Sequence, residues 1–159
     1  MGTVYLARDA GLARDVAIKT LERASASGVG RLKQEAQVLA AVSHAGIAQI
    51  HGIESWRGRP LLVVEYLAGG TLADRLRAGP LSAAVSVGIA LAVAEALGAL
   101  HESGYLHGDV KPNNIGFTSQ GTPKLLDFGL ARLADAGGGL AVDDGQAITV
   151  QGCAPVFGE

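Results

Sequence analysis

The sequence predicts an α+β fold in two lobes, because strand-like runs come first and helical patterns follow. Residues 1–64 carry short runs rich in Val, Ile and Leu around one amphipathic helix, expected at 31–42. After residue 70 the patterns become helical, and the pair Gly69-Gly70 between the two parts is typical of a flexible break. We therefore expect the lobes to join there. The expected strands of the first lobe are 4–7, a strand that starts at 16, 47–53 and 61–65.

The second lobe is expected to begin with a capped helix and to continue with a long apolar one. Thr71 is followed three residues later by Asp74, the spacing of a capping box. The uncharged stretch Leu81–Ala94 is shorter than the roughly 20 apolar residues of a membrane span. We therefore predict a buried helix between Ser82 and Ser103. Its apolar positions recur at helical spacing: Val85, Ile89, Val93, Leu97 and Leu100.

Composition excludes several classes of protein. The chain has 159 residues, of which 48% are hydrophobic, and this argues against disorder. Its 13 Lys and Arg against 15 Asp and Glu give a net charge of −2, so no basic excess indicates a nucleic acid partner. The single cysteine, Cys153, excludes an internal disulfide and a cysteine zinc site. The first residues lack the pattern of a signal peptide, and we expect a cytoplasmic protein without a membrane segment.

The segment from Tyr105 to Leu133, YLHGDVKPNNIGFTSQGTPKLLDFGLARL, places three chemically active side chains on one short loop. These are Asp109, Lys111 and Asn114, and the proline between them bars a regular helix. A carboxylate at Asp109 could orient a hydroxyl nucleophile.

A hairpin is expected directly after this loop, with strands at 115–118 and 124–126 and a turn at 120–122. Such a hairpin would bring Asp127 back beside Asn114. Two oxygen ligands near a lysine suit a hard cation that bridges phosphates, as Mg²⁺ does.

At these residues the chain resembles the protein kinase family. HGDVKPNN resembles the catalytic loop and LLDFGLA the metal-binding segment. Five such elements stand in the family's order, which makes the resemblance specific. The other three are VAIK at 16–19, the Gly2-Thr3-Val4-Tyr5 end of a glycine-rich loop, and LLVVEYLAGGTL at 61–72, which resembles the last strand of the small lobe and the hinge.

The resemblance implies an enzyme that uses ATP and Mg²⁺. In the catalytic loop, Asp109 would orient the substrate hydroxyl and Lys111 would neutralise the transferred phosphoryl group. Asn114 and Asp127 would bind the metal.

The resemblance also implies an ATP site between the lobes. Lys19 would hold the α- and β-phosphates and pair with Glu35, which sits on the first-lobe helix with Leu39 one turn later. Val64 would stand at the back of the site. The remaining ATP contacts would be Gly2 in the loop, Val4 and Ala17 over the adenine, and the backbone of Glu65 and Leu67 at its edge.

Several departures from the family pattern accompany the resemblance. Gly108 stands where many kinases have Arg, and Gly116 stands where the family places an apolar residue beneath the adenine. Of the glycines in the family's glycine-rich loop, only the last one, Gly2, is present. The family pattern continues with further helices, on which the long helix at Ser82–Ser103 would normally pack, so we expect part of the apolar surface of this helix to be exposed. We therefore expect a protein kinase-like two-lobe fold with an incomplete small lobe at 1–64, a hinge at 65–70 and a truncated helical lobe at 71–159.

Three functions are compatible with these motifs. The first is a Ser/Thr protein kinase acting on a protein hydroxyl, which Lys111 and the Asp-Phe-Gly at 127–129 favour. The second is a small-molecule phosphotransferase of the aminoglycoside type, whose loop also tends to read His-Gly-Asp. The third is an inactive, pseudokinase-like remnant, against which the intact Lys19 and Asp109 argue.

Overall fold

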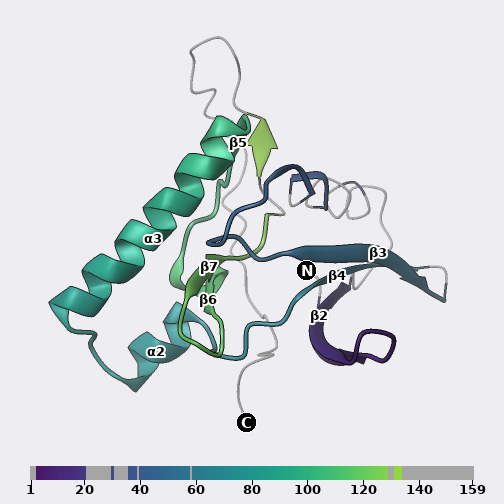
Figure 1. Ribbon diagram of the computed structural model, residues 1–159, viewed down its shortest axis with the longest axis horizontal. Coiled ribbons are helices and arrows are strands. Elements are labelled where there is room, and N and C mark those ends of the chain that lie inside the picture. The colour runs from purple at the N-terminus through teal and green to yellow at the C-terminus, as the bar shows by residue number, and fades with distance from the viewer. Residues whose placement is uncertain are drawn as a thin grey trace.

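The computed structural model describes residues 3–20, 30, 36–38, 40–57, 59–128 and 131–133. The early part of the chain forms a four-stranded antiparallel sheet with the order β1-β2-β4-β3. Figure 1 shows this sheet on one side, the helices α2 and α3 on the other, and the hairpin β6–β7 between them. The α+β class is confirmed, while the lobe boundaries at 64 and 70 stay a prediction. The sheet strands are β1 (Val4–Asp9), β2 (Arg14–Thr20), β3 (Ile50–Trp56) and β4 (Arg59–Glu65).

Strand β3 begins later than the sequence predicted. Residues 47–49 were expected to belong to it, but Ile47 forms an isolated parallel bridge with Leu125, and the Ala48 N–H donates to the Leu125 carbonyl at 3.0 Å. Ile47 and Ala48 therefore pair with β7, while the Gln49 carbonyl accepts from the Glu65 N–H at 2.8 Å. At the other end β3 runs on to Trp56 and β4 starts at Arg59, so the connection is shorter than expected.

The register of the sheet gathers the expected nucleotide residues on one face. Val4 pairs with Lys19 across β1 and β2, and Ala17 pairs with Val64 across β2 and β4. Directly opposed residues point to the same side of a sheet, as do residues two apart in one strand. Val4, Ala17, Lys19 and Val64 therefore share a face. Helical residues at 36–38 and 40–41 cover part of that face, because Ala36 and Val38 belong to the same core cluster as Leu62.

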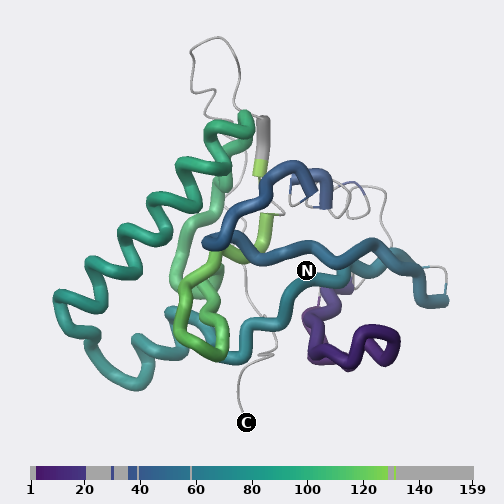
Figure 2. The backbone as a smooth tube through the Cα atoms, viewed as in Figure 1, coloured from purple at the N-terminus to yellow at the C-terminus, as the bar shows by residue number. Residues whose placement is uncertain are grey.

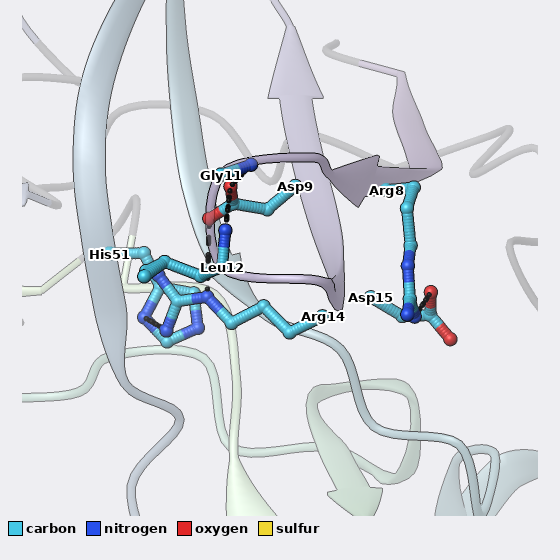
Figure 3. Close-up of polar contacts among 7 residues, drawn as sticks. All are labelled: Arg8, Asp9, Gly11, Leu12, Arg14, Asp15 and His51. Atoms are coloured by element: carbon cyan, nitrogen blue, oxygen red, sulfur yellow. Dashed lines mark hydrogen bonds and ion pairs between the residues drawn. The ribbon is translucent and has the colours of Figure 1, made fainter.

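The turn between β1 and β2 is held by a single carboxylate, as Figure 3 shows. Asp9 Oδ1 accepts hydrogen bonds from the N–H groups of Gly11 and Leu12, both at 3.1 Å. The Leu12 bond is the main reason that the pKa of Asp9 lies below its ordinary value. Arg14 lies 3.3 Å from Asp9 Oδ2 and 3.2 Å from Nδ1 of His51 on β3, which joins the hairpin to the far edge of the sheet.

The link between the lobes is closely packed. The Gly69 N–H donates to the Phe117 carbonyl at 2.8 Å, and the Phe117 N–H donates to the Gly70 carbonyl at 2.9 Å. A Cβ at position 69 would lie 2.5 Å from the carbonyl oxygen of Thr118. The glycine pair was expected to be a flexible break, but Gly69 serves to bring two backbones together, and Gly70 supplies a φ of 71°.

Helix α2 (Leu72–Ala78) begins with the capping box that the sequence predicts. Thr71 Oγ1 accepts from the Asp74 N–H at 3.2 Å, and Asp74 Oδ2 accepts from the Thr71 N–H at 2.8 Å. Partial burial raises the pKa of Asp74, but the bonds from Thr71 and the charge of Arg77 outweigh it, so this pKa lies below its ordinary value.

Helix α3 (Ala83–Glu102) forms where the sequence predicts it, and its apolar surface is exposed in part, as the departures from the family pattern lead us to expect. Only Ala96 and Leu100 are buried, and Val85 at the other end is 45% exposed. The helix packs on β5 and β7 with its C-terminal half, and its first turns extend past the core. By length and composition α3 is also the one helix of the described residues that could cross a membrane, and its C-terminal half packs on the core through Ala96 and Leu100.

Short elements after α3 carry the loop that was singled out in the sequence. They form two small antiparallel pairs, β5 with β8 and β6 with β7. The expected hairpin is confirmed, whereas the β5–β8 pair has no clear sequence signal. The elements are β5 (Tyr105–Leu106), the 3₁₀ turn Pro112–Asn114, β6 (Ile115–Phe117), β7 (Pro123–Leu125) and β8 (Arg132–Leu133).

We predict that Thr71→Ala destabilises the chain by about 1 kcal/mol, because the first turn of α2 loses its side-chain acceptor. Urea unfolding measures the change. Ser55→Ala, at an exposed position of β3, is the control and should change stability by less than about 0.5 kcal/mol. Equal effects of the two substitutions would contradict a capping role.

Candidate active site

The loop between β5 and β6 holds Asp109 through two side chains. Asn114 Nδ2 donates to the Asp109 carboxylate at 2.9 Å and to its backbone carbonyl at 2.9 Å. The Lys111 ammonium lies 2.7 Å from the same carboxylate oxygen, Oδ2. The 3₁₀ turn brings Asn114 back toward Lys111, whose carbonyl accepts from the Asn114 N–H at 2.8 Å. The three predicted catalytic residues therefore form one hydrogen-bonded cluster.

Asp127 reaches the same region from the end of the β6–β7 hairpin. The Leu126 N–H donates to the Asn114 carbonyl at 2.9 Å, so the two expected metal ligands lie on neighbouring stretches of backbone. Asp127 has a φ of 59°, a left-handed conformation that is uncommon outside glycine and that turns its side chain out of the strand direction. Its Oδ1 lies 2.7 Å from the Lys19 ammonium.

The contact between Lys19 and Asp127 joins the sheet to the catalytic loop region. The sequence places these residues in different lobes, and a kinase-like arrangement requires them to share a cleft. The side chain of Lys19 is 20% exposed and that of Asp127 is 43% exposed, so the pair is accessible to solvent. The predicted partner of Lys19, Glu35, lies outside the described residues, as does Gly2.

The His107 ring joins the backbone at Asp109 to the backbone at Leu126, the residue before Asp127. Its Nδ1 accepts from the Asp109 N–H at 3.3 Å, and its Nε2 donates to the Leu126 carbonyl at 3.1 Å. Only the neutral ring with a proton on Nε2 satisfies both contacts. Burial lowers the pKa of His107 below its ordinary value, in agreement with a neutral ring. The ring packs on fully buried Phe128, with centroids 4.8 Å apart.

Leucine side chains fill the space beside Gly116, the position where the family places an apolar residue beneath the base. Ala17 and Leu67 are buried, at 8% and 2% exposed. A Cβ at Gly116 would lie 2.5 Å from Leu67 Cδ1 and 2.9 Å from Leu126 Cδ1. These two leucines therefore occupy the space that a larger residue at position 116 would fill.

Glu65, at the end of β4, makes a contact that sequence reasoning missed. Its Oε2 lies 2.7 Å from the ammonium of Lys124 on β7. Lys124 stands three residues before Asp127, but a lysine in a short strand gives no sign of a partner 59 positions away.

The donor set fits a magnesium ion that is shared with a nucleotide. In the part of the chain that the structure describes, no three His, Cys, Asp or Glu side chains gather into a metal site of their own. A cation held by Asp127 and the amide oxygen of Asn114 would therefore complete its shell with phosphate oxygens and water, as Mg²⁺ commonly does.

Comparisons with known proteins agree with this geometry. The chain matches the protein kinase domain family over residues 1–153. It is 37% identical over 142 residues to the serine/threonine-protein kinase pkn2 of Myxococcus xanthus. The matched region is 85% of the chain and 17% of that protein. It is also 38% identical over 146 residues to the serine/threonine-protein kinase PknB of Mycolicibacterium smegmatis. Here the matched region is 86% of the chain and 23% of that protein. The chain thus spans about a fifth of the length of these relatives.

We predict that the folded chain loses stability as the pH falls below about 6.5. The unfolded His107 ring binds a proton near that pH, the ordinary value for histidine. The folded ring resists protonation, so acid favours the unfolded state. His107→Gln should be less stable at pH 7.5 and should show a flatter decline toward pH 5 in urea unfolding.

The control for this prediction is His101→Gln, at an exposed position in the last turn of α3. This variant should keep the pH dependence of the unmodified chain. A decline in His107→Gln as steep as in the unmodified chain would assign the acid sensitivity to other groups.

Proposed function

The chain belongs to the protein kinase family, and from that premise we propose that the full-length protein transfers the γ-phosphate of ATP to serine or threonine hydroxyls of a protein substrate. The observation that supports this proposal most directly is that Lys19 and Asp127, from different lobes, lie 2.7 Å apart. They stand near the cluster formed by Asp109, Lys111 and Asn114. The names of the relatives, serine/threonine-protein kinases, support the class of substrate. Apart from Gly108 in the loop, no observation favours the aminoglycoside-type alternative.

The proposed reaction uses the cluster as follows. The hydroxyl oxygen of the substrate forms a bond to the γ-phosphorus while the bond from that phosphorus to the β–γ bridging oxygen breaks, leaving ADP. Asp109 accepts the hydroxyl proton, and its orientation is set by Asn114 and Lys111. Lys111, beside Asp109, offsets the negative charge of the transferred group.

Lys19 and Asp127, whose charged groups lie 2.7 Å apart, would act at the other end of the phosphates. The Lys19 ammonium would hold the α- and β-phosphates, and the Asp127 carboxylate would hold the cation. Mg²⁺, when bound, supplies shielding of the phosphate charge. The base would lie against Val4 and Ala17, with its edge toward the backbone of Glu65 and Leu67.

We predict that Asp109→Asn lowers kcat for protein phosphorylation by about 10²- to 10⁴-fold in the full-length protein, because the amide cannot accept the proton. ATP affinity should change little, since Asp109 does not contact the nucleotide in this scheme. Transfer of labelled phosphate from ATP to a generic Ser/Thr protein substrate measures the rate, and nucleotide binding is measured separately.

Asp15→Asn is the matched control, since it removes an exposed carboxylate on β2 that pairs with Arg8. It should leave transfer unchanged. An Asp109→Asn variant as active as this control would refute the proposed role. An unmodified protein that phosphorylates an aminoglycoside, and no protein, would replace the proposal with the small-molecule alternative.

A further inference from the structure

One ion pair near the base site has no part in the chemistry proposed above. Lys124 Nζ lies 2.7 Å from Glu65 Oε2, and the two side chains are 15% and 23% exposed. The same oxygen accepts the N–H of Gln49 at 3.1 Å. The Glu65 N–H in turn donates to the Gln49 carbonyl at 2.8 Å. A single carboxylate therefore ties the end of β4 to both the 46–49 segment and β7.

The residue after Lys124 completes a closed set of contacts. The Leu125 N–H donates to the Gly46 carbonyl at 2.7 Å, and the Leu125 carbonyl accepts from Ala48 at 3.0 Å. Figure 2 shows the chain before β3 passing beside the green β6–β7 hairpin. The segment 46–49 thus bonds to β7 on one side and to Glu65 on the other. Lys124 of β7 contacts Glu65 directly and closes the set.

The low exposure of the pair makes its geometry hard to change. A charge held away from water needs both its partner and its remaining hydrogen bonds, and removing one partner leaves an uncompensated charge. Glu65 has Lys124 and the Gln49 N–H on one oxygen, so its rotamer is fixed. The peptide groups that follow Glu65 are those expected to meet the edge of the base.

We propose that Lys124 is a positioning residue that, through Glu65, holds the 65–67 backbone in its base-binding orientation. Because Lys124 lies three residues before Asp127, the pair also sets the spacing between the base end and the cation end of the nucleotide site. The proposal rests on the proposed function, since it assigns a role within that nucleotide site.

The test compares Lys124→Met with Lys124→Arg in the full-length protein. Lys124→Met keeps the length of the side chain without its charge, and it should raise the KM for ATP about tenfold with a smaller change in kcat. Lys124→Arg keeps the charge and should restore the KM to within about threefold of the unmodified value. Asp15→Asn breaks the exposed Arg8–Asp15 pair and should leave both constants unchanged.

Hydrogen exchange without nucleotide separates this inference from the proposed function. Lys124→Met should speed amide exchange at 65–67, while exchange in α3 stays as in the unmodified chain. An unmodified protein without phosphotransfer would refute the proposed function, and exchange at 65–67 would still show whether Lys124 fixes this backbone. Unchanged exchange, or an equal fall in kcat and kcat/KM that Lys124→Arg does not rescue, would overturn the positioning role.

Discussion

The backbone of Leu125 and Leu126 is the constraint on which the candidate site depends. Leu125 bonds to Gly46 and Ala48 from the first part of the chain, and Leu126 bonds to Asn114 and the His107 ring from the second. These contacts leave little freedom for the residue that follows, and Asp127 takes its left-handed conformation at that point. A two-residue stretch therefore sets the position of the sheet, the catalytic loop and the cation ligand relative to one another.

The charged pairs around this stretch differ in how easily they can exchange partners. The side chains of Lys19 and Asp127 are 20% and 43% exposed, and those of Lys111 and Asp109 are 34% and 26% exposed. Solvent weakens an ion pair, so phosphates bound here would replace these pairs at a lower cost than a more enclosed pair. Lys124 with Glu65 is more enclosed and has an additional backbone donor. The site thus has two kinds of ion pair. The pairs of Asp127 and Asp109, where a ligand would react, can exchange partners, whereas the Lys124–Glu65 pair holds the backbone in place.

Sequence reasoning reached the features that local chemistry decides. The capping box at Thr71, the β6–β7 hairpin and the cluster around Asp109 depend on residues within a few positions of one another, and their spacing is visible in the sequence. The apolar pattern of α3 does not show which of its residues are buried, but the resemblance to a family with further helices predicts that part of its apolar surface is exposed, as Val85 is. Pairing of Ile47 with Leu125, and of Lys124 with Glu65, depends on contacts between distant parts of the chain that no local pattern encodes.

The same long separations have a consequence for how the protein assembles during synthesis. Lys19 and Asp127 are 108 positions apart, whereas α3 forms from local hydrogen bonds. Local structure forms early and distant pairing late, because the entropy of closing a long loop is lost before the contact forms. The ribosome must therefore deliver residue 127 before the site can close. Until then α3 lacks β7, one of the two strands on which its C-terminal half packs, and that half of its apolar side is open to a chaperone that binds such surfaces.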